Sequence, residues 1–249
     1  MTHLAHIHRH PIKSIGYEVL TSTSLSQGRV LPFDRLWAVA HEAAKFDGQP
    51  TQWVAKHNFL RGVAGSELMA VKATLDETTQ QITLSHPAAQ TITLAPKDDG
   101  DQLIAWLLPL WPENRPGPDR VVSLSDGALI DVPEPYVSIA STASLTALSA
   151  DMQQDLSMHR FRGNLWVEGW NAFEELDMVG QTVRIGACEL KIEARIKRCR
   201  ATTGNPDTGK VDAETLDALN ANYGHQDFGV YARVMTSGTV ALNDQVEVL

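Results

Sequence analysis

A cysteine flanked by cations is the most reactive feature of this sequence. Cys199 follows Lys197 and Arg198 and precedes Arg200. Cations close to a sulfur favour the thiolate, which attacks electrophiles and binds soft metals. Residues 205–209 are rich in turn-forming types, so we expect Cys199 where a strand ends and a loop begins. The same pattern also fits a buried structural cysteine beside three solvated charges.

The second cysteine differs from the first in its position along a predicted strand. Cys188 shares one strand face with a series of apolar residues: Leu190, Ile192, Ala194 and Ile196. We therefore expect Cys188 to be packed and inert, whereas Cys199 falls outside this register. Two cysteines eleven positions apart do not indicate a disulfide framework or a zinc knuckle, so a reducing cytoplasm is the expected location.

Polar side chains that could bind an anion lie at the ends of several predicted strands and at the start of a predicted helix. A break after Pro11 presents Lys13 and Ser14, and Arg162 and Asn164 stand at the mouth of an apolar strand. Arginine recognises phosphate or carboxylate through paired hydrogen bonds. A helix predicted to start near Ser141 offers free N–H groups, although its hydroxyls also fit simple capping.

Composition restricts the classes of partner. The chain has 249 residues, 43% hydrophobic and 20% charged, with a formal net charge of −9. This balance is typical of a globular protein and argues against a general nucleic-acid binder, which needs a basic surface. No apolar run approaches the ~20 residues of a membrane helix, and the N-terminus does not resemble a secretory signal.

The elements that position these residues are mainly short strands. We expect strands over residues 4–9, 17–23, 34–40, 68–75, 81–84, 91–94, 136–140, 182–186, 188–196 and 228–234, an apolar strand within residues 160–169 and two more strands within residues 237–248. We expect helices over residues 102–110, 141–148 and 213–222. His6, His8 and His10 would share one strand face. Metal binding there is one possibility, but residues two apart on a strand lie ~6.6 Å apart and span one ion poorly, which favours a half-exposed polar strand.

Several common motifs are absent. The sequence has no dinucleotide-binding glycine pattern, phosphate-binding loop, zinc-protease helix or nucleophile elbow. We expect a mainly β (α+β) protein with a few short helices. A domain boundary falls between Pro96 and Pro118, and we place the domains at residues 1–100 and 101–249.

The order of the polar blocks resembles the MOSC superfamily. The blocks are Pro-Ile-Lys-Ser at 11–14, Asp-Arg-Leu-Trp at 34–37, Phe-Arg-Gly-Asn at 161–164, Arg-Cys-Arg-Ala-Thr-Thr at 198–203 and Phe-Gly-Val-Tyr at 228–231. The chain is similar to the branch in which an N-terminal β-barrel domain precedes the MOSC domain. That branch includes the mitochondrial amidoxime-reducing component and its bacterial relatives.

The resemblance implies a molybdenum cofactor, a pterin phosphate that carries a dithiolene-bound metal. It implies that Cys199 is the metal ligand at the catalytic centre. It also implies a set of cofactor-binding residues: Lys13, Ser14, Arg35, Ser144, Arg162 and Asn164. The cofactor would lie between a barrel formed by residues 1–100 and a second barrel formed by residues 101–249.

Three positions depart from the family pattern. Gly163 stands where a proline is usual. The usual Thr-x-Arg segment is replaced by residues 53–57, so that Lys56 or His57 would have to substitute for the arginine. Residues 176–178 replace an acidic-tryptophan ending.

The resemblance implies a molybdenum-dependent oxidoreductase that reduces N-hydroxylated or N-oxide compounds. Electrons would come from a separate flavin or iron–sulfur protein, because two cysteines are too few for a cluster. Neither nucleic acid nor membrane is an expected partner. The alternatives are a molybdenum-cofactor carrier and a sulfur carrier with a persulfide on Cys199.

Overall fold

A large mixed sheet forms the frame of the molecule. The computed structural model describes residues 1–249. Eight strands follow the order β15–β11–β12–β13–β9–β10–β1–β2, and only the β9–β10 pair is parallel. Their bounds are His3–Arg9 (β1), Glu18–Leu20 (β2), Val137–Ser141 (β9), Leu165–Glu168 (β10), Thr182–Ile185 (β11), Cys188–Lys197 (β12), Asp227–Thr236 (β13) and Val246–Val248 (β15).

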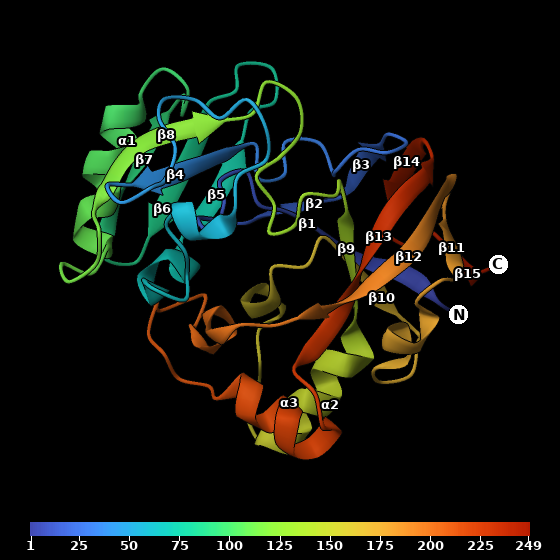
Figure 1. Cartoon of the computed structure of the whole chain (residues 1–249). Helices are drawn as coiled ribbons and strands as arrows, with labels where there is room; N and C mark the ends of the chain where they lie inside the picture. Colours follow the sequence, from blue (N-terminus) through green and yellow to red (C-terminus); the bar gives the residue numbers. More distant parts are fainter.

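A second region lies beside this frame, at the upper left of Figure 1. Strand β4 (Trp37–His41) pairs with β8 (Pro118–Ser123), and β5 (Lys72–Leu75), β6 (Ile82–His86) and β7 (Ala89–Leu94) form a separate sheet. Helix α1 (Gly100–Leu107) contributes Leu103 and Leu107 to the 16-residue core of this region. Burial of these side chains against Trp37 holds the helix on the strands, because removal of apolar surface from water is favourable.

The two regions share the start of the chain. Strands β1 and β2 belong to the large sheet, and β3 (Ser22–Leu25) pairs with β14 (Gly238–Ala241). Leu4, Ile7 and Leu25 accordingly pack into the 21-residue core of the large sheet. The mainly β class with three short α-helices is confirmed, whereas closed barrels and the boundary at residue 100 stay predictions.

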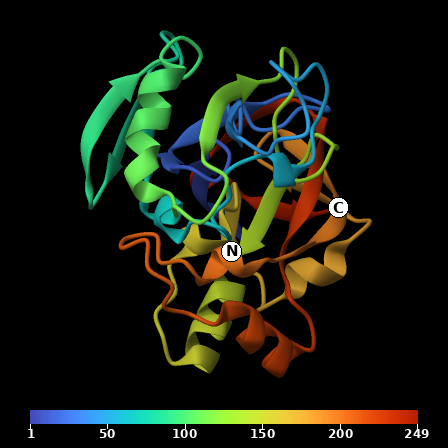
Figure 2. The ribbon, with the colours of Figure 1, turned by 60° about the vertical axis from the view of Figure 1, so that its left-hand side comes forward.

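The remaining two helices lie at the bottom of the molecule in Figures 1 and 2. They are α2 (Thr142–Met152) and α3 (Thr215–Tyr223). The Ser141 hydroxyl accepts a hydrogen bond from the Ala143 amide, which confirms its predicted capping role. None of the helices combines the length and the hydrophobicity needed to cross a lipid bilayer.

The strand predicted over residues 68–75 is wrong in its first half. Residues Ser66–Ala70 form a 3₁₀ turn, and β5 begins only at Lys72. Leu68, Met69 and Ala70 are all buried. A strand would alternate its side chains between two faces, whereas a tight turn inside the protein can bury consecutive residues.

The half-exposed strand predicted at the N-terminus is also wrong. His8, Arg9 and His10 are buried, because β1 lies between β10 and β2 and because its register shifts between Leu4 and His6. The buried Arg9 guanidinium is neutralised by Glu18, whose carboxylate accepts hydrogen bonds at 2.7 and 2.8 Å. No group of three or more histidine, cysteine or acidic side chains is placed to hold a metal ion.

Two neighbouring histidines predict a loss of stability in acid. The His159 ring stacks on Tyr17 with 3.7 Å between centroids and lies 4.6 Å from the His8 ring. Burial lowers the pKa of His8 to about 3, and burial, partly offset by Asp207, lowers the pKa of His159 to about 4. Both rings are therefore neutral in the folded protein, whereas the unfolded chain protonates them below about pH 6.5.

The free energy of unfolding should accordingly fall as the pH drops from about 6.5 towards 4, by about 1.4 kcal/mol per pH unit for each histidine. His159→Phe keeps an aromatic ring against Tyr17 but cannot be protonated, so this variant should show a shallower slope. Denaturant unfolding at several pH values measures how the free energy of unfolding depends on pH in each protein. Equal slopes for the two proteins would contradict the assignment.

Candidate functional site

A cavity of about 400 Å³ is lined by residues from both regions of the molecule. Its lining contains nine cationic residues: Lys13, Arg35, Lys56, Arg61, Arg160, Arg162, Arg195, Lys197 and Arg198. Asp131 is the only acidic residue among the 24 that line it. In a chain with a net charge of −9, this local excess of positive charge makes the cavity a candidate site for an anionic ligand.

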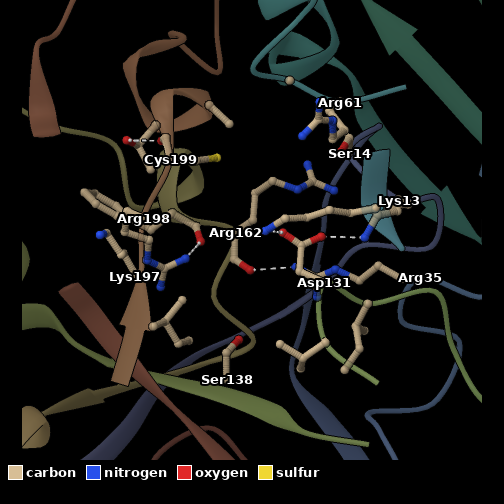
Figure 3. Close-up of a pocket in the computed structure, with 18 of the residues that line it drawn as sticks. Lys13, Ser14, Arg35, Arg61, Asp131, Ser138, Arg162, Lys197, Arg198 and Cys199 are labelled. Atoms are coloured by element: carbon tan, nitrogen blue, oxygen red, sulfur yellow. Dashed lines mark hydrogen bonds and ion pairs between the residues drawn. The ribbon is translucent and has the colours of Figure 1, made fainter. Parts of the chain in front are cut away.

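The cysteine at the end of β12 is exposed at this cavity. Cys199 directly precedes the 3₁₀ turn Arg200–Thr203, and its carbonyl accepts a hydrogen bond from the Thr202 hydroxyl at 3.1 Å. Figure 3 shows its sulfur directed into the cavity. Cys188, by contrast, is fully buried in the large core, and burial raises the pKa of its thiol. The predicted difference between the two cysteines is confirmed.

Arg198 fixes the backbone next to this thiol. Its guanidinium donates to the carbonyls of Phe161 and Phe228, each at 2.7 Å, and lies over both aromatic rings. Burial lowers the pKa of Arg198 to about 10, so the side chain stays charged near neutral pH. One terminal nitrogen, Nη2, is buried without a partner, which is costly for a charged donor unless a ligand accepts it.

The Pro-Ile-Lys-Ser block places a lysine and a hydroxyl at the cavity. The Lys13 ammonium donates to the Leu129 carbonyl at 2.7 Å and to the Asp131 carboxylate at 2.5 Å. Burial lowers the pKa of Lys13, and the Asp131 charge partly offsets this effect. Ser14 has a positive φ of 63°, and its side chain makes no hydrogen bond within the protein.

Arg35 connects the two regions across the cavity. It donates to the Arg162 carbonyl at 2.9 Å and forms an ion pair with Asp34. Burial opposes ionisation of Asp34, but the Arg35 charge and the hydrogen bonds from His10 outweigh it and hold the pKa of this carboxyl below its usual range. Because Asp34 is buried, this pair is not a weak, solvent-exposed salt bridge.

Arg162 lies at the centre of the cavity, and most of its hydrogen-bonding capacity is unused (Figure 3). Its only polar contact within the protein is to the Ile12 carbonyl at 3.5 Å. Burial beside Arg35 lowers the pKa of Arg162 to about 9, so the guanidinium is still charged at neutral pH but lacks a counter-ion. An anionic ligand would supply that counter-ion.

Three residues that line the cavity have a strained backbone conformation. Ser14, Arg35 and Arg162 all adopt the left-handed conformation, with φ of 63°, 49° and 48°. This conformation costs a residue other than glycine roughly 1–3 kcal/mol and is found preferentially at functional sites. Here it occurs at three of the predicted cofactor-binding residues.

Two predicted residues have their polar groups engaged elsewhere. Asn164 lines the cavity, but its amide accepts from Ser138 at 2.8 Å and donates to the His8 carbonyl at 3.2 Å. Ser144 does not line the cavity. Its buried hydroxyl donates to Glu175 at 2.9 Å and accepts from the Phe173 amide at 2.8 Å, so its hydrogen bonds are made within the protein.

Ser144→Ala is therefore expected to lower stability without changing ligand retention. Burial raises the pKa of Glu175, and the Ser144 hydroxyl is among the groups that stabilise its charged form. Loss of this donor should reduce the free energy of unfolding by roughly 1–3 kcal/mol. Denaturant unfolding and metal content, measured on the same preparation, test this. A drop in metal content at unchanged stability would instead place Ser144 in the site, as its sequence motif predicted.

The cavity contains residues that sequence reasoning did not single out. Arg61 lines it and forms no ion pair, and Asp131 joins Lys13 to Lys56 through both carboxylate oxygens. Of the two substitutes for the family arginine, Lys56 lines the cavity and His57 does not. Arg61 follows the apolar pair at residues 59–60, which is the only local signal that could have identified it.

Residues 125–247 match the family model described as the MOSC domain. This part of the chain is a MOSC domain. Mitochondrial amidoxime reducing component 2 from Homo sapiens is 34% identical over 121 residues, which cover 43% of this chain and 35% of the human protein. Molybdenum cofactor sulfurase from Drosophila willistoni is 28% identical over 148 residues, 56% of this chain and 18% of that protein.

The chain thus spans about a third or less of the length of these curated relatives. Among solved structures, the YUAD protein from Bacillus subtilis aligns over 100% of this chain and 96% of its own, with a TM-score of 0.47 and 13% identity. YiiM from Geobacillus stearothermophilus aligns over 45% of this chain and 53% of its own, with a TM-score of 0.34 and 14% identity.

Proposed function

We propose that the cavity binds a molybdenum cofactor and that the protein is a reductase of N-hydroxylated or N-oxide compounds. The observation that carries the proposal is an exposed thiol, Cys199, beside a cationic cavity in which Arg61, Arg162 and Arg198 form no ion pair. The MOSC match and relatives named as amidoxime-reducing components and as a molybdenum cofactor sulfurase support it.

The residues present fit such a cofactor. Its phosphate needs cations and hydrogen-bond donors, and unused donors are available on Arg61, Arg162 and Ser14. Its metal needs a soft ligand, and Cys199 offers a sulfur at the same cavity. The positive charges of Lys13 and Arg35 would attract the anion. Lys13 also holds Asp131 in place, and Arg35 holds the backbone at Arg162.

When bound, the cofactor would supply a metal centre that can change its oxidation state. In the proposed reaction an N-hydroxylated substrate takes up two electrons and two protons, its N–O bond breaks, and the oxygen leaves as water. The protein's own groups bind the cofactor and orient the substrate. Electrons would come from a separate flavin or iron–sulfur protein, since this sequence has only two cysteines and no dinucleotide-binding motif.

A cofactor carrier is the second candidate, favoured by the open position of Cys199 and by the relative named as a molybdenum cofactor sulfurase. The same open thiol also suits the third candidate, a persulfide sulfur carrier. A carrier needs no electrons and should release the cofactor intact to an acceptor protein that lacks it.

One assay separates the reductase from the carrier. Molybdenum-loaded protein is mixed with a reduced viologen dye and benzamidoxime. Dye oxidation that requires both the substrate and Cys199 supports the reductase. Absence of turnover with several N-oxygenated compounds, together with transfer of cofactor to an acceptor protein, would establish the carrier instead.

A further inference from the structure

One short segment holds the backbone on both sides of Cys199. This segment is the 3₁₀ turn η4 (Met158–Phe161). Before the thiol, Arg198 donates to the last carbonyl of η4 at 2.7 Å. After the thiol, Arg160 of η4 donates to the Thr203 carbonyl at 3.2 Å. The stretch of chain that carries the thiol is therefore attached to η4 at both of its ends.

The same segment leads directly into the central cation of the cavity. Arg162 is the residue that follows η4 in the chain. Any change in the way η4 lies against the stretch around Cys199 would therefore change the distance between the thiol and the Arg162 guanidinium. A ligand held at both points needs this distance to be constant, because productive geometry tolerates only small displacements.

Asp212 completes the attachment on the far side of the thiol. One of its carboxylate oxygens accepts from Arg160 at 2.6 Å, and the other accepts from the Asn205 side-chain amide at 2.6 Å. The Asp212 backbone amide donates to the Thr203 carbonyl at 3.2 Å. The buried Arg160 guanidinium thus donates to a carboxylate and to a carbonyl at once, a planar arrangement that only arginine provides.

A direct contact with a ligand is the competing role for Arg160. The residue lines the cavity, and its Nε is buried without a partner. The two roles predict opposite effects when the negative charge of Asp212 is removed. If Arg160 acts through its charge on an anion, the ligand should bind more tightly, because the cavity becomes more positive. If Arg160 acts by holding the chain, the ligand should bind more weakly.

We propose that Arg160 and Asp212 are a positioning pair that fixes the distance between the Cys199 sulfur and the Arg162 guanidinium. This inference rests on the proposed function, since a molybdenum cofactor would be held at both points. The pair acts through the backbone that it attaches, whereas Cys199 and Arg162 contact the cofactor. Groups behind a metal ligand commonly set its orientation in this way.

The test uses Asp212→Asn, which keeps the whole Arg160 side chain. Asparagine retains one acceptor oxygen but replaces the other with a donor, so the charge and one bond of the pair are lost. Molybdenum retention, measured by gel filtration of cofactor-loaded protein, should fall about 10-fold. Arg160→Lys keeps the positive charge but not the planar donors, and should have the same effect.

A second arginine–aspartate pair supplies matched controls. Arg120 donates to the Gly48 carbonyl at 3.2 Å and pairs with Asp119, and neither side chain lines the cavity. Asp119→Asn and Arg120→Lys therefore make the same chemical changes in another part of the protein. Molybdenum retention should be unchanged in both variants.

The ligands of the molybdenum that stays bound separate positioning from a contribution to stability. X-ray absorption should show fewer sulfur ligands per bound molybdenum in Asp212→Asn than in wild type. A pair that only stabilised the fold would leave each bound metal with its full set. The double variant with Arg160→Lys should be no weaker than the weaker single variant, because both changes break one interaction.

A second measurement needs no cofactor. A nitroxide is attached to Cys199 in protein prepared without cofactor, and Cys188 stays unlabelled because it is fully buried. The electron paramagnetic resonance spectrum should show a more mobile nitroxide in Asp212→Asn and in Arg160→Lys than in wild type. The spectrum of Asp119→Asn should match that of the wild type.

The outcomes for the pair and for the proposed function are distinguishable. Tighter cofactor retention in Asp212→Asn overturns the inference in favour of direct contact by Arg160, and unchanged retention with a full set of sulfur ligands also overturns it. Unchanged nitroxide mobility in both variants of the pair overturns it as well. A wild type that never holds molybdenum contradicts the proposed function, and the nitroxide comparison then decides whether the pair positions the thiol.

Discussion

Cys199→Ser is expected to abolish benzamidoxime reduction and to remove a sulfur ligand from the metal. The thiol is exposed at the cavity, and serine offers a hard oxygen in place of a soft sulfur. Changes in the groups around metal ligands commonly cost 10–100-fold in activity or affinity, so loss of a direct ligand should exceed about 100-fold. X-ray absorption at the molybdenum edge should show one sulfur fewer.

Cys188→Ser is the matched control, because it makes the same chemical change inside the core. Cys188 is fully buried in the large core. This variant should lower stability, since it buries a hydroxyl among apolar side chains, but leave the metal's sulfur ligands unchanged. If the Cys188 variant lost a sulfur and the Cys199 variant kept all of them, the assignment of the two cysteines would be reversed.

Arg162→Ala should release the cofactor while it leaves the fold almost as stable as before. The guanidinium makes only a 3.5 Å contact within the protein, so little intramolecular bonding is lost. A hydrogen bond to a charged group is worth roughly 1.5–3 kcal/mol, which corresponds to about 10–150-fold weaker retention. Molybdenum content after gel filtration, beside the melting temperature, gives both quantities.

Two further variants sharpen this prediction. Arg162→Gly should lose the cofactor to the same extent and gain stability, because glycine adopts the φ of 48° without strain. Arg29→Ala removes an exposed arginine that is paired with Asp126 and does not line the cavity, so cofactor content should not change. Equal occupancy in wild type and Arg162→Ala, together with a large drop in melting temperature, would show that Arg162 has a structural role.

The pattern of neighbouring residues in the sequence predicted the features that depend on local geometry. The alternation of apolar residues along β12 is enough to separate the buried Cys188 from the exposed Cys199. The helix start at Ser141 followed from its capping chemistry. Both results arise because strand periodicity and caps depend on neighbours a few residues away.

Features that depend on distant contacts were not predictable in the same way. The burial of β1 requires strands β2 and β10 on either side of it, and β10 lies far along the sequence. The 3₁₀ turn Ser66–Ala70 replaces a strand because its neighbours bury consecutive residues. No single-sequence pattern encodes either arrangement, since tertiary packing overrides local propensity.

The site was only partly predictable for the same reason. Family motifs identified Lys13, Ser14, Arg35 and Arg162, which the fold brings to one cavity. They do not identify Arg61 or Asp131, which reach the cavity from two separate segments. Ser144 lies in a matching motif, yet the fold turns its hydroxyl to Glu175.

Metal and pterin analysis is the most direct test of the central claim that the cationic cavity beside Cys199 holds a molybdenum cofactor. The protein is purified from a host that makes the cofactor, and its molybdenum and oxidised pterin are measured against protein concentration. We expect about one molybdenum and one pterin per chain, with both lost in Arg162→Gly, because one exposed cysteine and one cationic cavity are available to hold them. Protein without molybdenum from a cofactor-replete host would contradict both the reductase and the carrier.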